Sequence, residues 1–307
     1  MRNAFVRELT VLAARDPSVI LITGDLGFGV LTEFARQFPR QYINAGVAEQ
    51  NMTALAVGLA LEGKVVFTYS IANFPTLRCL EQIRNDACYH RANVKIVSVG
   101  AGFAYGPLGI SHHATEDLAI MRALPNLTLF SPGDSTEVQL VTRAAHETAG
   151  VCYLRLGRGG EPVVHQHQPT FTLGEPIRLF SGGDLAILAT GGILAVAQQT
   201  RAMLEAKGRS TALFSVPTIK PFPVAWLREL APKVKLIITV EEHTIVGGLG
   251  GCAAEVLAEM ADAAPLLRCG LDDQFSCIVG SQDYLRRRYG LTPERLSERV
   301  LAVLGQF

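Results

Sequence analysis

The chain has 307 residues, of which 49% are apolar, and its 28 Lys plus Arg residues balance its 28 Asp plus Glu residues. This length and apolar content predict two domains with substantial cores. The zero net charge argues against a surface for nucleic acid or anionic membrane, and a neutral, apolar chain is prone to associate, so we expect an oligomer.

The N-terminal segment is not a secretory signal, because Arg7 and Glu8 interrupt it before an apolar core can form. The apolar runs are strand-length and fall short of the ~20 residues that span a bilayer. No two of the cysteines form a CxxC pair, and we expect buried free thiols and a cytoplasmic location. The cysteines are Cys79, Cys88, Cys152, Cys252, Cys269 and Cys277.

Short apolar runs alternate with longer amphipathic stretches through the first half, which is typical of parallel α/β units. We expect strands at residues 19–23, 65–69, 94–99, 127–130 and 152–156. A helix is expected at 49–62, where apolar residues recur at helical spacing. A second helix is expected at 136–148, capped by Asp134 or Ser135.

Residues 161–176 contain three prolines and no periodicity, so we interpret them as an interdomain linker. A second α/β series follows, with strands at 184–190, 211–216 and 236–240 and helices at 193–207, 247–260 and 293–304. The predicted fold class is therefore α/β, with two domains at residues 1–165 and 166–307, each a mostly parallel sheet flanked by helices.

The most informative segment is NAGVAEQN, residues 44–51. A glutamate at a helix start commonly just favours the helix macrodipole. Glu49, however, lies between small residues and the apolar Met52, which predicts a tight and dry environment. Because desolvation raises a carboxyl pKa, such a glutamate could share a proton near neutrality.

GVAEQNMTALAVGLALEG resembles the glutamate signature of the transketolase family, in its pyrimidine-binding domain. The resemblance continues in order through SIANFPTLRCLEQIRND, GISHHATEDLAIMRALPNL, FSPGDSTEV and YLRLGRG, and then through LAILATGG, VPTIKPF and TVEEHTIVGGLGG. It implies a pyrimidine-binding domain followed by a transketolase C-terminal domain. It also implies that Glu49 hydrogen-bonds the aminopyrimidine of thiamine diphosphate, which activates the cofactor.

The resemblance extends to the walls of the cofactor pocket. Aromatic side chains usually enclose the aminopyrimidine in transketolases, and Phe74 in SIANFPTL matches one of them. Ile71 and Leu77 stand where two more aromatics are usual, so Ile71 is a weaker wall candidate. Packing in the core is the alternative role for Phe74.

Two adjacent histidines, His112 and His113, lie in the glycine-rich segment GPLGISHHATED. A histidine titrates near neutrality and can move substrate protons, although a single one more often has a structural role. By resemblance His112 matches the active-site histidine of transketolases, and His113 takes the position of a glutamine. Leu108 and Gly100 replace an acid and a histidine of the family, which puts its usual sugar phosphates in doubt.

Three further residues are candidates for binding. Arg158 in LRLGRGG aligns with an arginine that binds substrate phosphate in transketolases, and Arg155 is its neighbour. Arginine suits phosphate through its bidentate fork, although a surface ion pair is the alternative. Asp25 follows a strand, where ligands gather in α/β sheets, and matches an acid near the cofactor.

Glu241, Glu242 and His243 precede the run GGLGG, which could cradle an anion at a helix N-terminus. The two carboxylates would repel a phosphate, however. The resemblance places these residues in a domain that helps assembly and takes no part in catalysis.

Full transketolases bind diphosphate and a divalent metal through a GDG segment, and this sequence contains none. A diphosphate needs a hard cation with oxygen ligands, usually Mg²⁺, and we identify no metal ligands here. We therefore expect a separate N-terminal transketolase subunit that carries the GDG motif. Two chains of each kind would form an α2β2 heterotetramer.

The predicted function is that of the pyrimidine-side subunit of a transferase that uses thiamine diphosphate to move a two-carbon ketol unit between sugars or sugar-like carbonyl compounds. The alternative is a beta subunit of a 2-oxo acid dehydrogenase or another enzyme that decarboxylates pyruvate and transfers the acyl group. A non-catalytic assembly subunit is a third reading, against which the glutamate argues.

Overall fold

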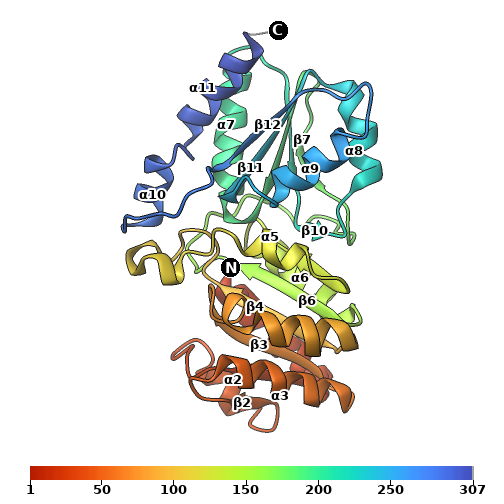
Figure 1. Cartoon of the computed structure of the whole chain (residues 1–307), viewed down its shortest axis with the longest axis vertical. Helices are drawn as coiled ribbons and strands as arrows, with labels where there is room; N and C mark the ends of the chain where they lie inside the picture. Colours follow the sequence, from red (N-terminus) through yellow and green to blue (C-terminus); the bar gives the residue numbers. More distant parts are fainter. Residues whose placement is uncertain (306–307) are drawn as a thin grey trace.

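The computed structural model describes residues 1–305 and shows two stacked α/β units (Figure 1). The first unit is built on a seven-stranded sheet in the order β10-β5-β6-β4-β3-β1-β2, and the second on a five-stranded sheet in the order β12-β11-β8-β9-β7. All strand pairs are parallel except β10 with β5 and β7 with β9. The predicted fold class is confirmed.

The first unit alternates helices and strands along the chain. Its elements are α1 (Arg2–Arg15), β1 (Val19–Thr23), α2 (Thr32–Gln37), β2 (Tyr42–Asn44), α3 (Glu49–Leu61), β3 (Val65–Ile71), α4 (Leu80–Gln82), β4 (Val94–Val99), α5 (Asp117–Arg122), β5 (Leu127–Phe130), α6 (Ser135–Glu147) and β6 (Val151–Leu156). A π-helical stretch, Ile83–Cys88, continues α4.

The second unit repeats the pattern after a connection without helix or strand. Its elements are β7 (Ile177–Phe180), β8 (Leu185–Thr190), α7 (Leu194–Ala206), β9 (Thr211–Ser215), β10 (Thr218–Lys220), α8 (Val224–Leu230), β11 (Leu236–Thr244), α9 (Leu249–Leu257), β12 (Leu266–Leu271), α10 (Gln282–Arg288) and α11 (Pro293–Leu304). Strand β10 lies beyond residue 165 and still completes the first sheet.

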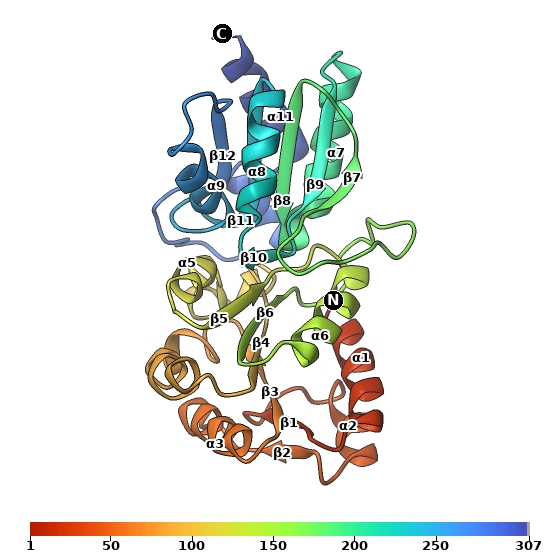
Figure 2. The ribbon, with the colours of Figure 1, turned by 90° about the vertical axis from the view of Figure 1, so that its right-hand side faces the viewer.

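Helices cover both faces of each sheet (Figure 2). In the first unit, α1 and α6 lie on one face, and α3 and α5 lie on the other. In the second unit, α7 and α11 pack on one face, while α8 and α9 pack on the opposite face. Central strands buried on both faces explain the continuous apolar runs in the sequence.

One apolar cluster crosses the boundary between the units. It joins Leu118 and Met121 on α5 to Leu249 and Cys252 on α9. Burial of these side chains stabilises the contact through the hydrophobic effect. The two units therefore share part of their core and hold each other in place.

The predicted strands and helices are confirmed, with ends that differ by a few residues. Asp134 is the cap of α6, because its Oδ1 accepts the backbone N–H groups of Thr136 and Glu137 at 2.9 and 3.0 Å. The helices α1, α2, α4, α5, α8 and α10 and the strands β2, β7, β10 and β12 were not predicted from sequence. The strands are edge strands and the helices are short, except α1, a helix of 14 residues at the N-terminus.

The cysteine prediction needs one correction. Five of the cysteines are buried free thiols, but Cys277 is exposed, because it lies in a loop between β12 and α10. None of the helices within residues 1–305 is long and apolar enough to cross a membrane.

Candidate active site

The candidate residues meet where the parallel strands of the first sheet end. Asp25 follows β1, Phe74 follows β3, and Arg158 follows β6. Glu49 is the first residue of α3, after β2, and the loop with both histidines follows β4. Carboxyl ends of parallel strands lie at one edge of a sheet, where α/β proteins bind ligands. The sheet topology thus brings together segments that are far apart in sequence.

Glu49 is buried, with 5% of its surface exposed. Its Oε2 accepts a hydrogen bond from Nη1 of Arg78 at 2.9 Å, and the two side chains form an ion pair. The arginine side chain is about half exposed, at 49%. The carboxylate is therefore enclosed by protein but reached from solvent by one cationic side chain.

Arg78 also covers Phe74. Its guanidinium carbon lies 4.7 Å from the centre of the phenylalanine ring, within the range of a cation–π contact. Arg78 was not among the candidates from sequence. Phe74 lies in a turn before the 3-10 helix Leu77–Cys79, so no helical spacing in the sequence links the two residues.

His112 lies on the other side of Phe74. The two ring centres are 5.1 Å apart with an interplanar angle of 77°, and Nδ1 of His112 is 3.0 Å from Oγ of Ser111. Partial burial lowers the pKa of His112 below its usual value, and the charge of neighbouring His113 adds to the effect. His112 is thus largely neutral at pH 7 and able to accept a proton.

Tyr105 continues the line of side chains. Its ring centre is 6.1 Å from that of His112, and the guanidinium carbon of Arg158 lies 5.2 Å from it on the ring's face. Gly100 makes room for this ring. It has a φ of +114°, and a Cβ atom there would lie 2.7 Å from Cε2 of Tyr105. The tyrosine ring therefore occupies the space that a side chain at position 100 would need.

These contacts form a continuous line, which we call the site row. It consists of Glu49, Arg78, Phe74, His112, Tyr105 and Arg158. A hollow of about 320 Å³ opens beside it, lined by Asn73, Phe74, Leu77, Arg78, Ile110 and Ser111. Four of the six members of the row were candidates from sequence. Tyr105 and Arg78 depend on contacts between loops and had no motif to mark them.

Asp25 and Ile71 flank the row. Asp25 is exposed, has a φ of +55°, and accepts a hydrogen bond at Oδ1 from the side chain of Asn44 at 2.9 Å. Its own N–H donates to Oδ1 of Asn44 at 2.9 Å, so the two residues brace each other. Ile71 is half-buried at the end of β3. Neither makes a polar contact with Glu49.

Arg155 must be corrected as a candidate for phosphate. It lies inside β6, it is 2% exposed, and its Nε donates to Oδ2 of Asp117 at 2.8 Å. Its Nη2 donates to the carbonyls of Ala114 and Glu242. A buried guanidinium with these partners has no access to a ligand. Arg158, three residues later, follows the strand and is exposed.

His113 must be corrected as well. Its side chain is fully buried, with Nε2 3.1 Å from the carbonyl of Gly106 and the ring edge-on to Phe103 at 5.1 Å. The side chain of His113 lies beneath the loop, whereas the side chain of His112 contacts members of the site row. Its position therefore indicates a packing role for His113.

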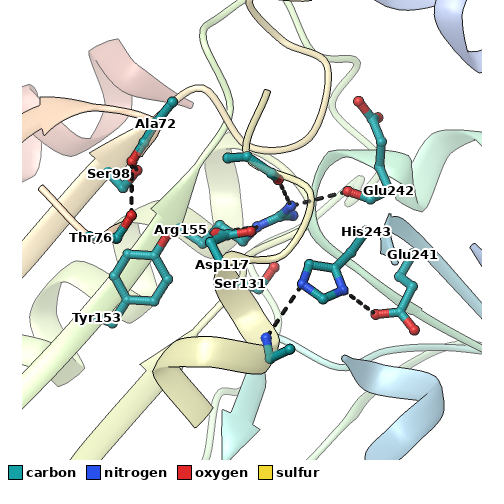
Figure 3. Close-up of polar contacts among 12 residues, drawn as sticks. Ala72, Thr76, Ser98, Asp117, Ser131, Tyr153, Arg155, Glu241, Glu242 and His243 are labelled. Carbon is teal, nitrogen blue, oxygen red and sulfur yellow. Dashed lines mark hydrogen bonds and ion pairs between the residues drawn. The ribbon is translucent and has the colours of Figure 1, made fainter. Parts of the chain in front are cut away.

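The segment Glu241, Glu242 and His243 lies on β11 and does not form an anion site. The carboxylate of Glu241 already fills the N-terminus of α9, where it accepts the N–H groups of Leu249 and Gly250 at 2.7 and 2.8 Å. Burial raises the pKa of Glu241 to about 7, against the effect of these hydrogen bonds. Figure 3 shows His243 between Glu241 and the first unit, to which it is joined through the N–H of Ala119.

Apolar side chains are exposed around the row. Phe28 and Val47, next to Asp25 and Glu49 in sequence, are 80% and 76% exposed, and Leu108 and Ile110 near His112 are 56% and 51% exposed. Such clusters on a water-facing surface are typical of a protein interface. Within residues 1–305, no group of three or more His, Cys, Asp or Glu side chains could hold a metal ion.

Comparison with protein families gives two matches that together cover most of the chain. Residues 1–161 match the model of the transketolase pyrimidine-binding domain, and residues 174–296 match that of the transketolase C-terminal domain.

Individual relatives match at nearly full length. A putative transketolase C-terminal section of Methanocaldococcus jannaschii is 38% identical over 305 residues, which are 98% of this chain and 95% of that protein. One of the subunits of an apulose-4-phosphate transketolase of Phocaeicola vulgatus is 34% identical, over 98% of this chain and 96% of its own. A solved structure described as a split gene transketolase, inactive beta4 tetramer, is 36% identical with a TM-score of 0.89, over 99% of this chain and 97% of its own.

Proposed function

The chain belongs to the transketolase family, with the pyrimidine-binding and C-terminal domains, and we propose that it is the pyrimidine-side subunit of a split, thiamine-diphosphate-dependent transketolase. The reaction is transfer of a two-carbon ketol unit between sugars or sugar-like carbonyl compounds. The near full-length match to separate transketolase subunits favours this reading over a 2-oxo acid dehydrogenase subunit.

A single arrangement carries the proposal, namely a buried carboxylate beside an open aromatic face. An aminopyrimidine is a planar group that needs a carboxyl partner at its edge and a ring against its face. Arg78 provides an internal test of the fit, since its planar guanidinium contacts Oε2 of Glu49 and the ring of Phe74 at once. The pair can therefore receive a planar, hydrogen-bonding group.

Each residue of the row has a proposed role. Thiamine diphosphate, when bound, supplies the carbon nucleophile and the electron sink of the reaction. Glu49 holds or shares a proton at the edge of the aminopyrimidine, while Phe74 packs on its face and Ile71 and Asp25 flank the cofactor. His112 moves protons on the substrate.

Arg158 is proposed to bind an anionic group of the substrate. It is exposed and lies at the far end of the row from Glu49, where the guanidinium fork suits phosphate. An apulose 4-phosphate, as named for the Phocaeicola vulgatus relative, has a phosphate of this kind. Leu108 and Gly100 remove the polar contacts of common transketolases, so we propose a donor other than the usual xylulose phosphate.

The partner completes the site. We propose that a second, unlike chain brings the GDG segment and binds the diphosphate through Mg²⁺, and that two chains of each kind form a cytoplasmic heterotetramer. The exposed apolar side chains Phe28 and Val47 beside the cofactor edge support an interface there. The inactive state named for the solved beta tetramer supports the need for a partner.

Substitution of the glutamate tests the proposed function. Glu49→Gln keeps the shape of the side chain but cannot hold the proton, so activity of the reconstituted pair should fall by about 100-fold or more. Glu62→Gln, at the other end of the same helix and exposed, is the matched control and should retain activity. Near wild-type turnover by Glu49→Gln, followed by mass spectrometry of the products, would refute the mechanism.

A further inference from the structure

The loop that follows β4 carries two members of the site row but little regular structure. We call residues 100–115 the site loop, which contains Tyr105 and His112 and only two short 3-10 turns, Gly106–Leu108 and Ile110–His112. Its backbone must be fixed by other parts of the protein if these side chains are to stay in place. The C-terminal unit supplies those contacts.

Glu242 on β11 reaches the base of the site loop. Its Oε1 accepts the backbone N–H of Phe103 at 2.6 Å, and the side chain is 4% exposed. Nε of Arg286 donates to Oε2 at 2.6 Å, and Nε2 of Gln282 donates to both oxygens at 2.9 and 3.1 Å. The buried carboxylate is therefore fully satisfied, and its neutralising partners come from α10.

The loop approaches Glu242 so closely that only glycine fits at position 102. A Cβ atom on Gly102 would lie 2.6 Å from Oε1 of Glu242, and the residue has a φ of +59°. Gly102 also pairs with Ala114 through two backbone hydrogen bonds of 2.9 and 3.0 Å. Glu242 thus acts at the point where the two ends of the loop are joined.

Strand β11 also holds the end of the loop. The N–H of Thr244 donates to the carbonyl of Thr115 at 2.8 Å. Nη2 of Arg155 bridges the carbonyls of Ala114 and Glu242 at 2.8 and 3.1 Å. In Figure 3 the backbone carbonyl of Glu242 faces Arg155, whereas the carboxylate of Glu242 points away from Arg155. Backbone and side chain of Glu242 therefore make separate contacts.

Contacts inside the loop link this anchor to the row. The ring of Phe103 packs edge-on against His113 at 5.1 Å and stacks on Tyr289 of the C-terminal unit at 5.4 Å. His113 lies between His112 and Ala114 in the sequence, and Ala114 is the residue that pairs with Gly102. A shift of the Phe103 backbone would therefore move the packing beneath His112.

We propose that Glu242 is a positioning residue that fixes the site loop, and with it His112 and Tyr105, from the C-terminal domain. This inference rests on the proposed function only for its effect on catalysis, since the anchor itself is a property of this chain. It gives a role to the Glu241–Glu242–His243 segment, in which Glu241 caps α9 and Glu242 holds the loop.

Hydrogen exchange in the isolated chain tests the anchor without any activity. Glu242→Ala removes the acceptor for Phe103, whose amide should exchange at least about tenfold faster, together with amides up to His112. Glu242→Gln keeps an acceptor oxygen, so its Phe103 amide should exchange at a rate between those of wild type and Glu242→Ala. It provides a second variant if the alanine form does not fold. Glu255→Gln is the control, because Glu255 pairs with Arg122 across the same units at an exposed site.

Turnover of the chain paired with its partner supplies the second readout. With thiamine diphosphate saturating, Glu242→Ala should bind cofactor as wild type does and lose about 10- to 100-fold in kcat, since Glu49 and Phe74 lie on other segments. Wild-type exchange at Phe103 in both Glu242 variants would overturn the anchor, and wild-type kcat in an active pair would overturn the positioning role of Glu242 in catalysis. A wild-type pair that transfers no ketol unit would refute the proposed function instead, and the exchange result would still decide the anchor.

Discussion

The guanidinium of Arg78 lies 2.9 Å from the carboxylate of Glu49, and it rests on the face of Phe74. An aminopyrimidine bound in the proposed manner needs the same carboxylate and the same ring face. In the free chain Arg78 therefore occupies the place that the proposed cofactor would need. Thiamine diphosphate bound in that manner would have to move Arg78 aside.

Arg78→Met should tighten cofactor binding to the assembled enzyme by about tenfold, because the cofactor no longer displaces a charged group. The free chain should lose about 1 kcal/mol of unfolding free energy, since a buried carboxylate loses a half-exposed partner. Calorimetry and denaturant titration measure the two effects. Arg84→Met is the control, because Arg84 is exposed and bonds only to Asn85. Weaker cofactor binding by Arg78→Met would mean that Arg78 supports the bound cofactor.

Tyr105 should restrict the donor. Its ring fills the space over Gly100 beside His112, so a donor with a long, hydroxylated chain meets an aromatic wall there. Tyr105→Val should raise the ratio of kcat/KM for a pentulose phosphate over that for hydroxypyruvate by about tenfold, since only the longer donor gains room. Tyr89→Val, at an exposed position away from the row, should leave the ratio unchanged. An unchanged ratio in Tyr105→Val would show that the ring does not limit the donor.

His112 should set the acidic side of the pH profile. Burial and neighbouring His113 lower its pKa below 6.5, so the neutral base is already present at neutral pH. If His112 accepts a substrate proton, kcat/KM should rise with pH through that lowered pKa and then level off, and His112→Asn should abolish this rise. Initial rates between pH 5 and 8 cover the range in which histidine titrates. A midpoint above 6.5 that persists in His112→Asn would assign the rise to another group.

The sheets could be predicted from sequence because their central strands are buried on both faces and therefore read as apolar runs. Glu49, Phe74 and His112 could be named because each lies in a recognisable segment. Arg78 and Tyr105 could not, since each matters through a neighbour that only the fold brings close. The packing of the Tyr105 ring against Gly100 can be recognised only in the folded structure.

Arg155 was wrongly named as a candidate for binding phosphate, and its place in the sequence already argued against that role. Residue 155 was already expected within a strand of the first sheet, and such a strand is buried on both faces. Arg155 therefore had to be inside and paired, as it is with Asp117, while Arg158 lies past the strand end. The contact of Glu242 with the first unit could not be predicted for a related reason. Strand β11 extends to Thr244, four residues further than expected, and carries the glutamate into the boundary between the units.

Assembly should control cofactor binding. The proposed pyrimidine side of the site lies in this chain, whereas residues 1–305 contain no cluster of His, Cys, Asp or Glu that could hold a metal for the diphosphate. Most of the binding energy of a charged diphosphate comes from the metal and its ligands, so this chain alone should bind thiamine diphosphate weakly even with excess Mg²⁺. Adding the partner should restore tight binding and activity together, because a cofactor shared between two chains stabilises their interface by mass action.

Calorimetry on the isolated chain, before and after addition of the partner, measures this directly. The control is Glu49→Gln, which should still assemble with the partner because the substitution keeps the size of the side chain. Assembly without activity in that variant would separate the two roles of the interface. Tight, Mg²⁺-dependent binding of the cofactor to the chain alone would contradict the split-site proposal, since it would require a diphosphate site within this chain.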